Sequence, residues 1–222
     1  GPTPDPIITP TPTITSTGMN ITRDEPSHNL VVKFGATEAD TNVISNLTNE
    51  ELSNLLNATN KQWTAYSDNS SQLNVTLDNG VYTYTGATAE IDSISITGTG
   101  ADNNTFNYVI YSKTVDNVLT WYIDKPLAIL GSSDSDLAAI HYKDFATAYK
   151  NVTDTNSYIT LLGNATVTTQ IEVTKYITID GGTNKYGLTT TMADALFKLT
   201  NDLNDNTKTV TLKNVTISCM SF

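Results

Sequence analysis

The apolar segment YITLL at residues 158–162 returns along the chain as YITID at 176–180, as LFKL at 196–199 and as VTI at 215–217. The intervals are 18, 20 and 20 residues, counted over Ile159, Ile177, Phe197 and Ile217. A repeat of this length is typical of a solenoid, in which each turn buries its apolar side chains against its neighbours. The run from Ser157 to Ile217 therefore predicts a coil of short stacked strands.

Turn residues divide this run into several strands. Gly163-Asn164 and Gly181-Gly182 are typical of corners. Because crossovers between parallel strands nearly always take one hand, we expect a right-handed coil. Further strands are expected at residues 166–168, 171–173, 188–190 and 210–212.

A helix is expected directly before the coil. Phe145, Ala148, Tyr149 and Val152 have the i, i+3, i+4 and i+7 spacing of an amphipathic helix of about 10 residues. The first turn of a solenoid would otherwise expose its apolar end to water, so a terminal element has to cover it. We expect this helix to be that cap.

Composition indicates a mainly β chain. Hydrophobic residues make up 38% and charged residues 16%, and much of the remainder is Thr, Asn and Ser, which favour strands and turns. The net charge of −11 repels phosphate backbones and anionic lipids, which disfavours nucleic-acid and membrane-surface binding. No apolar stretch approaches the ~20 residues that span a bilayer, and the single cysteine, Cys219, has no partner for an internal disulfide.

Residues 1–18 are rich in proline and threonine, a composition that favours extended chain over a packed core. We expect a disordered linker, which is either a spacer that holds the protein away from a cell envelope or an ordinary disordered terminus. Gly1-Pro2 resembles the remnant of a protease cleavage site. This resemblance predicts that a natural leader peptide was cut away before Gly1.

Residues 19–130 predict a separate β-rich unit that contains one helix. Asn29–Phe34 is expected to be a strand. Thr48-Asn49-Glu50-Glu51 has the form of a capping box, and the leucines that follow share one face, which predicts a helix over 49–58. Two β-prone runs, 106–115 and 118–123, flank Asp116-Asn117 with the spacing of a tight antiparallel hairpin.

The stretch before that hairpin allows two interpretations. Read locally, Leu73–Leu77 and Val81–Tyr84 flank Asp78-Asn79-Gly80 as a hairpin. Read against the repeat, Ile94–Ile96 returns 19 residues after Val75, as a turn of the coil would. The Ser- and Asp-rich residues 131–136 are the expected boundary, which assigns 131–222 to the capped coil.

Two groups of residues have a recognisable order. The first is Leu77–Tyr82 with Ile94–Gly100, and the second is Ala139-Ile140, Tyr142, Phe145, Ala148, Ile159–Leu162, Ile171–Val173, Tyr176–Gly182 and Leu188-Thr189. They resemble the cap and first turns of right-handed parallel β-helix proteins, a pectate-lyase-like class with bacterial and archaeal adhesin-like surface proteins among its members. The resemblance implies a fold and a secreted or surface location, but no single activity, because the class also contains polysaccharide lyases and hydrolases.

The expected coil does not contain a matched pair of carboxylates for acid/base catalysis. Glu172, Asp180 and Asp194 fall at different phases of the repeat, whereas a catalytic pair needs equivalent places in successive turns. Asp180 precedes two glycines, where its side chain is expected to bond the turn backbone. The β-helix lyases combine clustered aspartates with an Arg or Lys base, and here the only arginine, Arg23, lies outside the coil. No catalytic residue is assigned.

Two pairs of aspartates are the candidates for calcium: Asp134 and Asp136, and Asp202 and Asp205. Neither pair has the spacing of an EF-hand, so solvated loops without a metal are the alternative, and no other cofactor is expected. His28, His141 and Cys219 are not grouped as zinc ligands or as a nucleophile with its base. His141 is expected to be a partly buried residue at a strand end.

Trp63 and Tyr66 follow the expected helix of the N-terminal unit. Neighbouring aromatic side chains of this kind either cover the end of a core or form a platform on which a sugar ring stacks. Both interpretations remain open from the sequence.

These features predict a non-catalytic, secreted or cell-surface protein that serves adhesion or display and contacts a glycan or a surface protein. The alternative is the N-terminal part of a polysaccharide lyase or glycoside hydrolase whose active turns lie beyond residue 222. The apolar residues near the end of the sequence predict either a truncated coil or association with a second copy through the open end.

Overall fold

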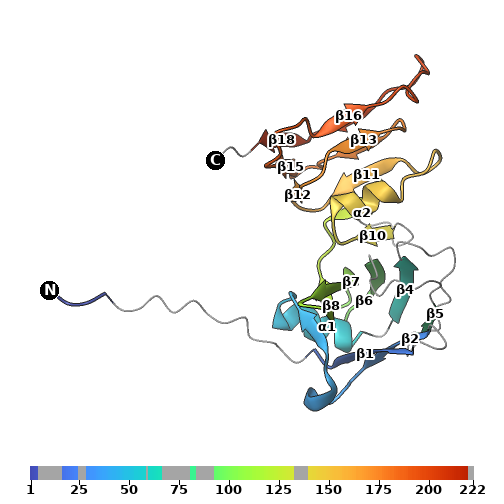
Figure 1. Ribbon diagram of the computed structural model, residues 1–222. Coiled ribbons are helices and arrows are strands. Elements are labelled where there is room, and N and C mark those ends of the chain that lie inside the picture. Colours follow the sequence, from blue (N-terminus) through green and yellow to red (C-terminus); the bar gives the residue numbers. More distant parts are fainter. Residues whose placement is uncertain are drawn as a thin grey trace.

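The computed structural model describes residues 1–4, 17–24, 29–58, 60–66, 81–83, 93–132 and 140–219. Its regular structure is mainly β, as composition predicts. In Figure 1 the strands from β11 to β18 lie in a stack above the group formed by β1 to β8 and α1, with β10 and α2 between them.

The N-terminal group contains two sheets. The first has the order β1-β2-β5 and is antiparallel throughout. The second has the order β3-β8-β7-β6-β4, in which only β3 and β8 are parallel. The bounds are β1 Met19–Asp24, β2 Asn29–Phe34, η1 Glu38–Asp40, β3 Val43–Ser45, α1 Asn49–Leu56, β4 Asn60–Tyr66, β5 Val81–Thr83, β6 Ser93–Thr99, β7 Thr105–Val115 and β8 Val118–Asp124.

Apolar side chains from both sheets and from α1 form the core of this group. Ile94, Ile110 and Ile123 are fully buried in it, and Leu55 of α1 packs against them. The strand predicted at 29–34 is confirmed as β2, and the predicted helix ends two residues earlier than expected, at Leu56.

The predicted hairpin is confirmed by β7 and β8, which pair from Val115 with Val118 onward. Asp116 and Asn117 have φ values of 49° and 64°, the left-handed conformation that a two-residue hairpin turn requires. Ile94 and Ile96 lie in β6, between the antiparallel neighbours β4 and β7. The interpretation of this segment as a coil turn is therefore wrong.

The hairpin expected at 73–84 lies mostly outside the described residues. Of it the structure describes β5, which pairs with β2 in antiparallel fashion. The expectation for residues 1–18 also falls largely outside them, as does His28.

The C-terminal group consists of three sheets with the orders β10-β9-β11-β14-β17, β12-β15-β18 and β13-β16. From β11 onward all neighbours are parallel, and the chain enters the three sheets in the same sequence each time. The bounds are β9 Ala128–Leu130, β10 Ile140–Tyr142, α2 Phe145–Lys150, β11 Tyr158–Leu161, β12 Ala165–Val167, β13 Ile171–Val173, β14 Thr178–Asp180, β15 Gly187–Thr190, β16 Phe197–Leu199, β17 Thr211–Lys213 and β18 Thr216–Cys219.

The register differs from the repeat predicted from sequence. Ile159 pairs with Ile179, not Ile177, and Ile179 pairs with Leu212. Phe197 and Ile217, which the near-constant interval placed in the same column, lie in two other sheets. The inward apolar residues set the pairing, whereas the connections between strands differ in length, so counting along the chain assigns the wrong partners.

A helix precedes the parallel strands as predicted, but it is six residues long. Asp144 is its N-cap, and its Oδ1 accepts a hydrogen bond of 2.7 Å from the amide of Thr147. Phe145 and Ala148 are buried in the C-terminal core, where Tyr149 packs against them. Its apolar spacing therefore identified the buried face correctly.

The sheet that contains β11 also spans the expected boundary at 131–136. β9 lies before that boundary and pairs with both β10 and β11. β10 in turn packs against β6 and β7 of the N-terminal group. His141 of β10 is fully buried rather than partly buried as expected.

Candidate functional site

A groove of about 950 Å³ lies between the two groups of sheets. One wall comes from α1, β7 and the residues after β8, and the other from the ends of β11, β14 and β17. Its lining is mostly polar, with tyrosines at Tyr108 and Tyr186. The groove has about twice the volume of a second hollow beside α2, which measures about 470 Å³, and is therefore the default candidate site.

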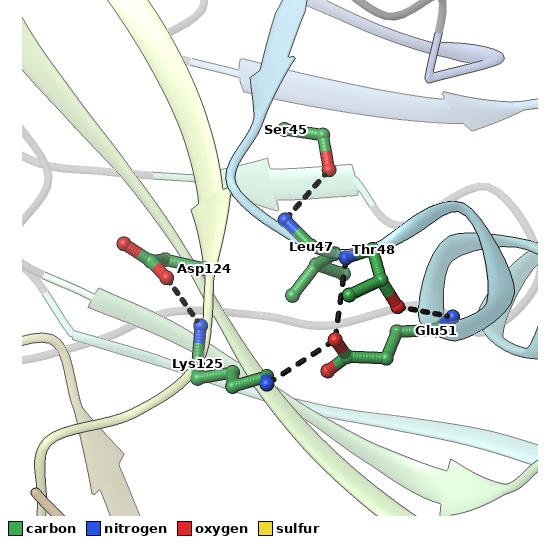
Figure 2. Close-up of polar contacts among 6 residues, drawn as sticks. All are labelled: Ser45, Leu47, Thr48, Glu51, Asp124 and Lys125. Carbon is green, nitrogen blue, oxygen red and sulfur yellow. Dashed lines mark hydrogen bonds and ion pairs between the residues drawn. The ribbon is translucent and has the colours of Figure 1, made fainter.

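The first wall depends on the start of α1, shown in Figure 2. The Thr48 hydroxyl accepts a hydrogen bond of 3.1 Å from the Glu51 amide, and Glu51 Oε1 accepts one of 3.2 Å from the Thr48 amide. This confirms the predicted capping box. The same carboxylate lies 3.2 Å from Nζ of Lys125, which ties the helix to the residue that follows β8.

The surroundings of Glu51 keep it ionised. Partial burial raises the pKa of this carboxyl, but the hydrogen bonds with Thr48 and the charge of Lys125 outweigh burial and lower the pKa overall. A proton donor at neutral pH needs a raised pKa instead. Glu51 is therefore a structural anion that also presents negative charge to the groove.

The second wall contains a column of polar residues from three adjacent strands. Thr160 of β11 is in register with Asp180 of β14, which is in register with Lys213 of β17, and all three line the groove. Neighbouring strands lie roughly 4.8 Å apart, so the column presents one polar group per strand at that spacing.

Asp180 is the best-anchored member of the column. Its Oδ1 accepts a hydrogen bond of 2.8 Å from the Gly182 amide, its Oδ2 accepts one from the Tyr158 hydroxyl, and Nζ of Lys213 lies 4.0 Å away. The predicted role of Asp180 in bonding the turn backbone is confirmed. A Cβ at Gly181 would lie 2.0 Å from the Asn214 carbonyl oxygen, so the turn needs glycine at that position.

These contacts also determine the protonation states of Asp180 and Tyr158. Burial raises the pKa of Asp180, but the hydrogen bonds from Tyr158 and Gly182 and the charge of Lys213 lower it overall. The hydrogen bond to Asp180, together with burial, raises the pKa of Tyr158 to about 12. Neither group changes its charge near neutral pH, so the column is suited to binding rather than to proton transfer.

The groove carries a net negative charge. Four carboxylates line it against two ammonium groups, which leaves two negative charges: Glu50, Glu51, Asp102 and Asp180 against Lys125 and Lys213. Asp102 is held in place because its amide donates a 3.0 Å hydrogen bond to the side-chain oxygen of Asn54 on α1. The wall formed by the N-terminal group is therefore the more acidic of the two.

The other carboxylates singled out from sequence lie elsewhere or serve local structure. Glu172 of β13 is exposed and lies 3.9 Å from Lys198 of β16, and Asp194 is exposed on the loop before β16. Among Glu172, Asp180 and Asp194, only Asp180 lines the groove.

Of the calcium candidates, Asp134 and Asp136 lie outside the described residues. Asp205 Oδ1 accepts hydrogen bonds from the amide and the hydroxyl of Thr207, and Asp202 Oδ2 accepts one from the Thr200 hydroxyl. These bonds give both aspartates a local role in their turns. Across the described ranges, no group of three or more metal-binding side chains is present.

The glycan candidates Trp63 and Tyr66 belong to β4, and their side chains are not among those described. The sequence did not identify the groove residues Glu50, Asp102 and Lys213. The capping box located α1, but the surface that α1 faces depends on how the two groups of sheets pack together.

Comparison with protein-family models, with curated proteins and with solved structures finds no match to this chain. Within the described residues, no helix is long and apolar enough to cross a bilayer. Inferences about function therefore depend on the geometry of the chain itself.

Proposed function

We propose that residues 158–219 are the first turns of a right-handed parallel β-helix, capped by β9 and α2. The support is the repeated passage of the chain through three sheets in the same order, with parallel pairing at every step after β11. Each new strand adds an apolar residue to a column that is already buried, as Ile179 does beside Ile159. This is how a solenoid builds its core.

The proposed function is non-catalytic adhesion or display by a secreted or cell-surface protein, with the groove as its glycan-binding site. The observation that carries this proposal is the column of Thr160, Asp180 and Lys213 along the groove wall. Hydroxyl, carboxylate and ammonium groups pair with sugar hydroxyls. A strand spacing of roughly 4.8 Å is comparable with the step of one sugar residue along an extended chain.

The charge of the groove narrows the class of glycan. With two excess carboxylates in the groove and a net charge of −11 on the chain, a polyuronate would be repelled. A neutral or amine-bearing oligosaccharide meets no such barrier. The proposed ligand is therefore not the acidic polysaccharide that a pectate-lyase-like class would suggest.

The experiment is calorimetric titration with three hexasaccharides of matched length: cellohexaose, a fully deacetylated chitosan hexamer and hexagalacturonate. We expect the neutral and amine-bearing hexamers to bind and the uronate not to bind. Lys213→Ala should weaken binding of cellohexaose by about two- to tenfold, because one hydrogen-bond donor is removed from the groove. Binding of none of the three, or of the uronate alone, contradicts the proposal.

Lys198→Ala is the matched control for Lys213→Ala. Both lysines are about equally exposed (61% and 59%), and each lies about 4 Å from a carboxylate, but Lys198 lies on β16, outside the groove lining. The control should bind the hexamers as the parent does. Shortening of any hexamer during incubation would favour a glycoside hydrolase or lyase instead.

A further inference from the structure

The hollow of about 470 Å³ beside α2 shares no lining residue with the groove. Its sides are α2 with the N-cap Asp144 and the turn from β12 to β13, and α2 packs against β12 (Figure 1). A volume of this size lies in the range of pockets that bind small molecules. The hollow is therefore a second candidate site, and the chemistry of its lining indicates what it accepts.

The side chains around the hollow are fixed by contacts within the chain. The Tyr149 hydroxyl donates a 2.5 Å hydrogen bond to the carbonyl oxygen of Glu172, which joins α2 to β13. The Tyr149 ring lies 6.2 Å from the buried ring of Phe145, centroid to centroid. Nε2 of Gln170 donates a 2.8 Å hydrogen bond to the carbonyl oxygen of Ala195. Because the lining is already ordered, a ligand that binds there loses less free energy to the ordering of side chains.

The charged groups of the hollow are acidic. Asp144 and Glu172 line it, and over the described parts of the chain no lysine or arginine is among its lining residues. Asp144 Oδ1 accepts the 2.7 Å hydrogen bond from the Thr147 amide that caps α2. Nζ of Lys198 lies 3.9 Å from Glu172, but both side chains are more than 60% exposed, so this ion pair contributes little. Charge complementarity therefore favours a cationic ligand.

The uncharged part of the lining suits a sugar ring better than an aliphatic amine. The Tyr149 ring provides an aromatic surface, and the apolar part of the lining consists of Ala146, Val167 and Ile171. Three exposed hydroxyls line the same hollow, those of Thr166, Thr168 and Thr169. The apolar face of a pyranose packs on an aromatic ring, while its hydroxyls exchange hydrogen bonds with threonine hydroxyls. A lysine side chain would use the charge and the apolar surface, but it has no hydroxyls to pair with the threonines.

We propose that this hollow binds an amino sugar whose amine is free, with the ammonium group attracted by Asp144 and Glu172 and the ring packed against Tyr149. Hydrogen bonds from an ammonium group to carboxylates are roughly twice as strong as hydrogen bonds between neutral groups. N-acetylation removes the charge of the amine, and a neutral sugar lacks the amine altogether. The site therefore selects the deacetylated form, and it does so independently of the groove.

The test follows amide chemical shifts of nitrogen-15-labelled protein at a pH that keeps the amines protonated. The probes are methyl glucosaminide, methyl N-acetylglucosaminide, methyl glucoside and Nα-acetyl-lysine amide. We expect the amides of α2 and of residues 166–172 to shift with methyl glucosaminide and to saturate at about 0.1–10 mM sugar. The other three probes should bind at least about tenfold more weakly, because each lacks either the charge or the sugar ring. No shift with methyl glucosaminide, or equal binding of any other probe, would overturn the proposal.

Asp144→Asn and Glu172→Gln each remove one negative charge and preserve the fold. Asn caps helices about as well as Asp does, and Glu172 is exposed. Each variant should weaken binding of methyl glucosaminide by about three- to tenfold, because a hydrogen bond to a carboxylate becomes one to a neutral amide. Asp194→Asn is the matched control, since Asp194 is exposed and lines neither the hollow nor the groove. It should bind like the parent.

The double variant Asp144→Asn, Glu172→Gln separates the two sites. If it is folded by its amide spectrum and still binds methyl glucosaminide like the parent, the assignment of the hollow is wrong, and so it is if Asp194→Asn loses as much. Cellohexaose has no amine and so reports on the groove alone. Its titration should be the same for the double variant and the parent, and a changed titration would contradict the independence of the hollow.

Discussion

At the scale of single residues, Asp180 links the turn, the sheet and the groove. It accepts hydrogen bonds from the Gly182 amide and the Tyr158 hydroxyl, and its side chain is only 11% exposed. One carboxylate therefore stabilises the turn, joins β14 to Tyr158 of β11 and lines the groove. Because the pKa of Asp180 is lowered in the folded chain, the contribution of this residue to stability depends on pH.

Asp180→Asn should lower the free energy of unfolding by about 1–2 kcal/mol at pH 7, because the charge-assisted hydrogen bonds weaken. A folded pKa below the unfolded value means that this contribution is fully present above the unfolded pKa of roughly 3.9 and is lost as pH falls through the folded pKa. The gap between parent and variant should therefore shrink between about pH 5 and pH 3. Urea unfolding of the parent and the variant across this pH range measures the difference in their free energies of unfolding.

Asp194→Asn is the control for this series, because Asp194 is an exposed carboxylate outside the groove. It should change stability by less than about 0.5 kcal/mol at any pH in the range. A gap for Asp180→Asn that widens toward pH 3 would contradict a pKa of Asp180 that is lower in the folded than in the unfolded chain.

At the scale of elements, α1 shows how local and tertiary interactions combine. The capping box satisfies two backbone amides at its start, and the same Glu51 side chain pairs with Lys125 beyond β8. Figure 2 shows both interactions converging on one carboxylate. The position of the acidic wall of the groove therefore depends on a helix cap.

Thr48→Ala should cost about 1 kcal/mol of stability, the usual loss for an N-cap of this kind. Glu51→Gln keeps a hydrogen-bond acceptor for the Thr48 amide and loses only the ion pair, so it should cost less than about 1 kcal/mol. Thr37→Ala is the control, since the Thr37 hydroxyl caps no backbone amide of η1 and donates only an exposed 3.0 Å hydrogen bond to the Asp40 carboxylate. Thermal unfolding compares the three, and equal losses would contradict the capping role.

At the scale of the whole molecule, two separate cores are stacked along the chain. The N-terminal core contains Ile110 and Ile123, and the C-terminal core contains Ile159 and Ile179. Figure 1 shows the resulting elongated stack, with β10 and α2 at the junction. Strands inside a sheet and strands at its edge should differ in local stability, because among the described residues β14 has paired strands on both sides and β17 on one side.

Hydrogen exchange should therefore follow position in the stack. Amides of β14, which has β11 and β17 as neighbours, should exchange more slowly than those of β17, whose one neighbour among the described strands is β14. Mass-spectrometric exchange of peptides over 178–180 and 211–213 measures this difference, and equal protection of the two peptides would contradict it.

Local patterns in the chain predicted much of the fold. The capping box at Thr48, the two-residue turn at Asp116-Asn117 and the helical spacing around Phe145 each depend on neighbours within a few residues, and each is confirmed. The strand segments after residue 158 were also located correctly, because alternating apolar residues and glycine corners mark them. What these patterns share is that their physical cause lies within the segment itself.

Long-range pairing was decided by tertiary structure alone. Ile159 takes Ile179 as its partner because both side chains point into one core, whereas an interval counted along the chain selected Ile177. The antiparallel neighbours of Ile94 and the groove between Glu51 and Asp180 likewise join residues far apart in sequence. Periodicity in the sequence indicates which side of a strand is apolar. It does not indicate which other strand buries that side, because the loops between strands differ in length. The groove forms only when the two cores pack together and bring its walls close.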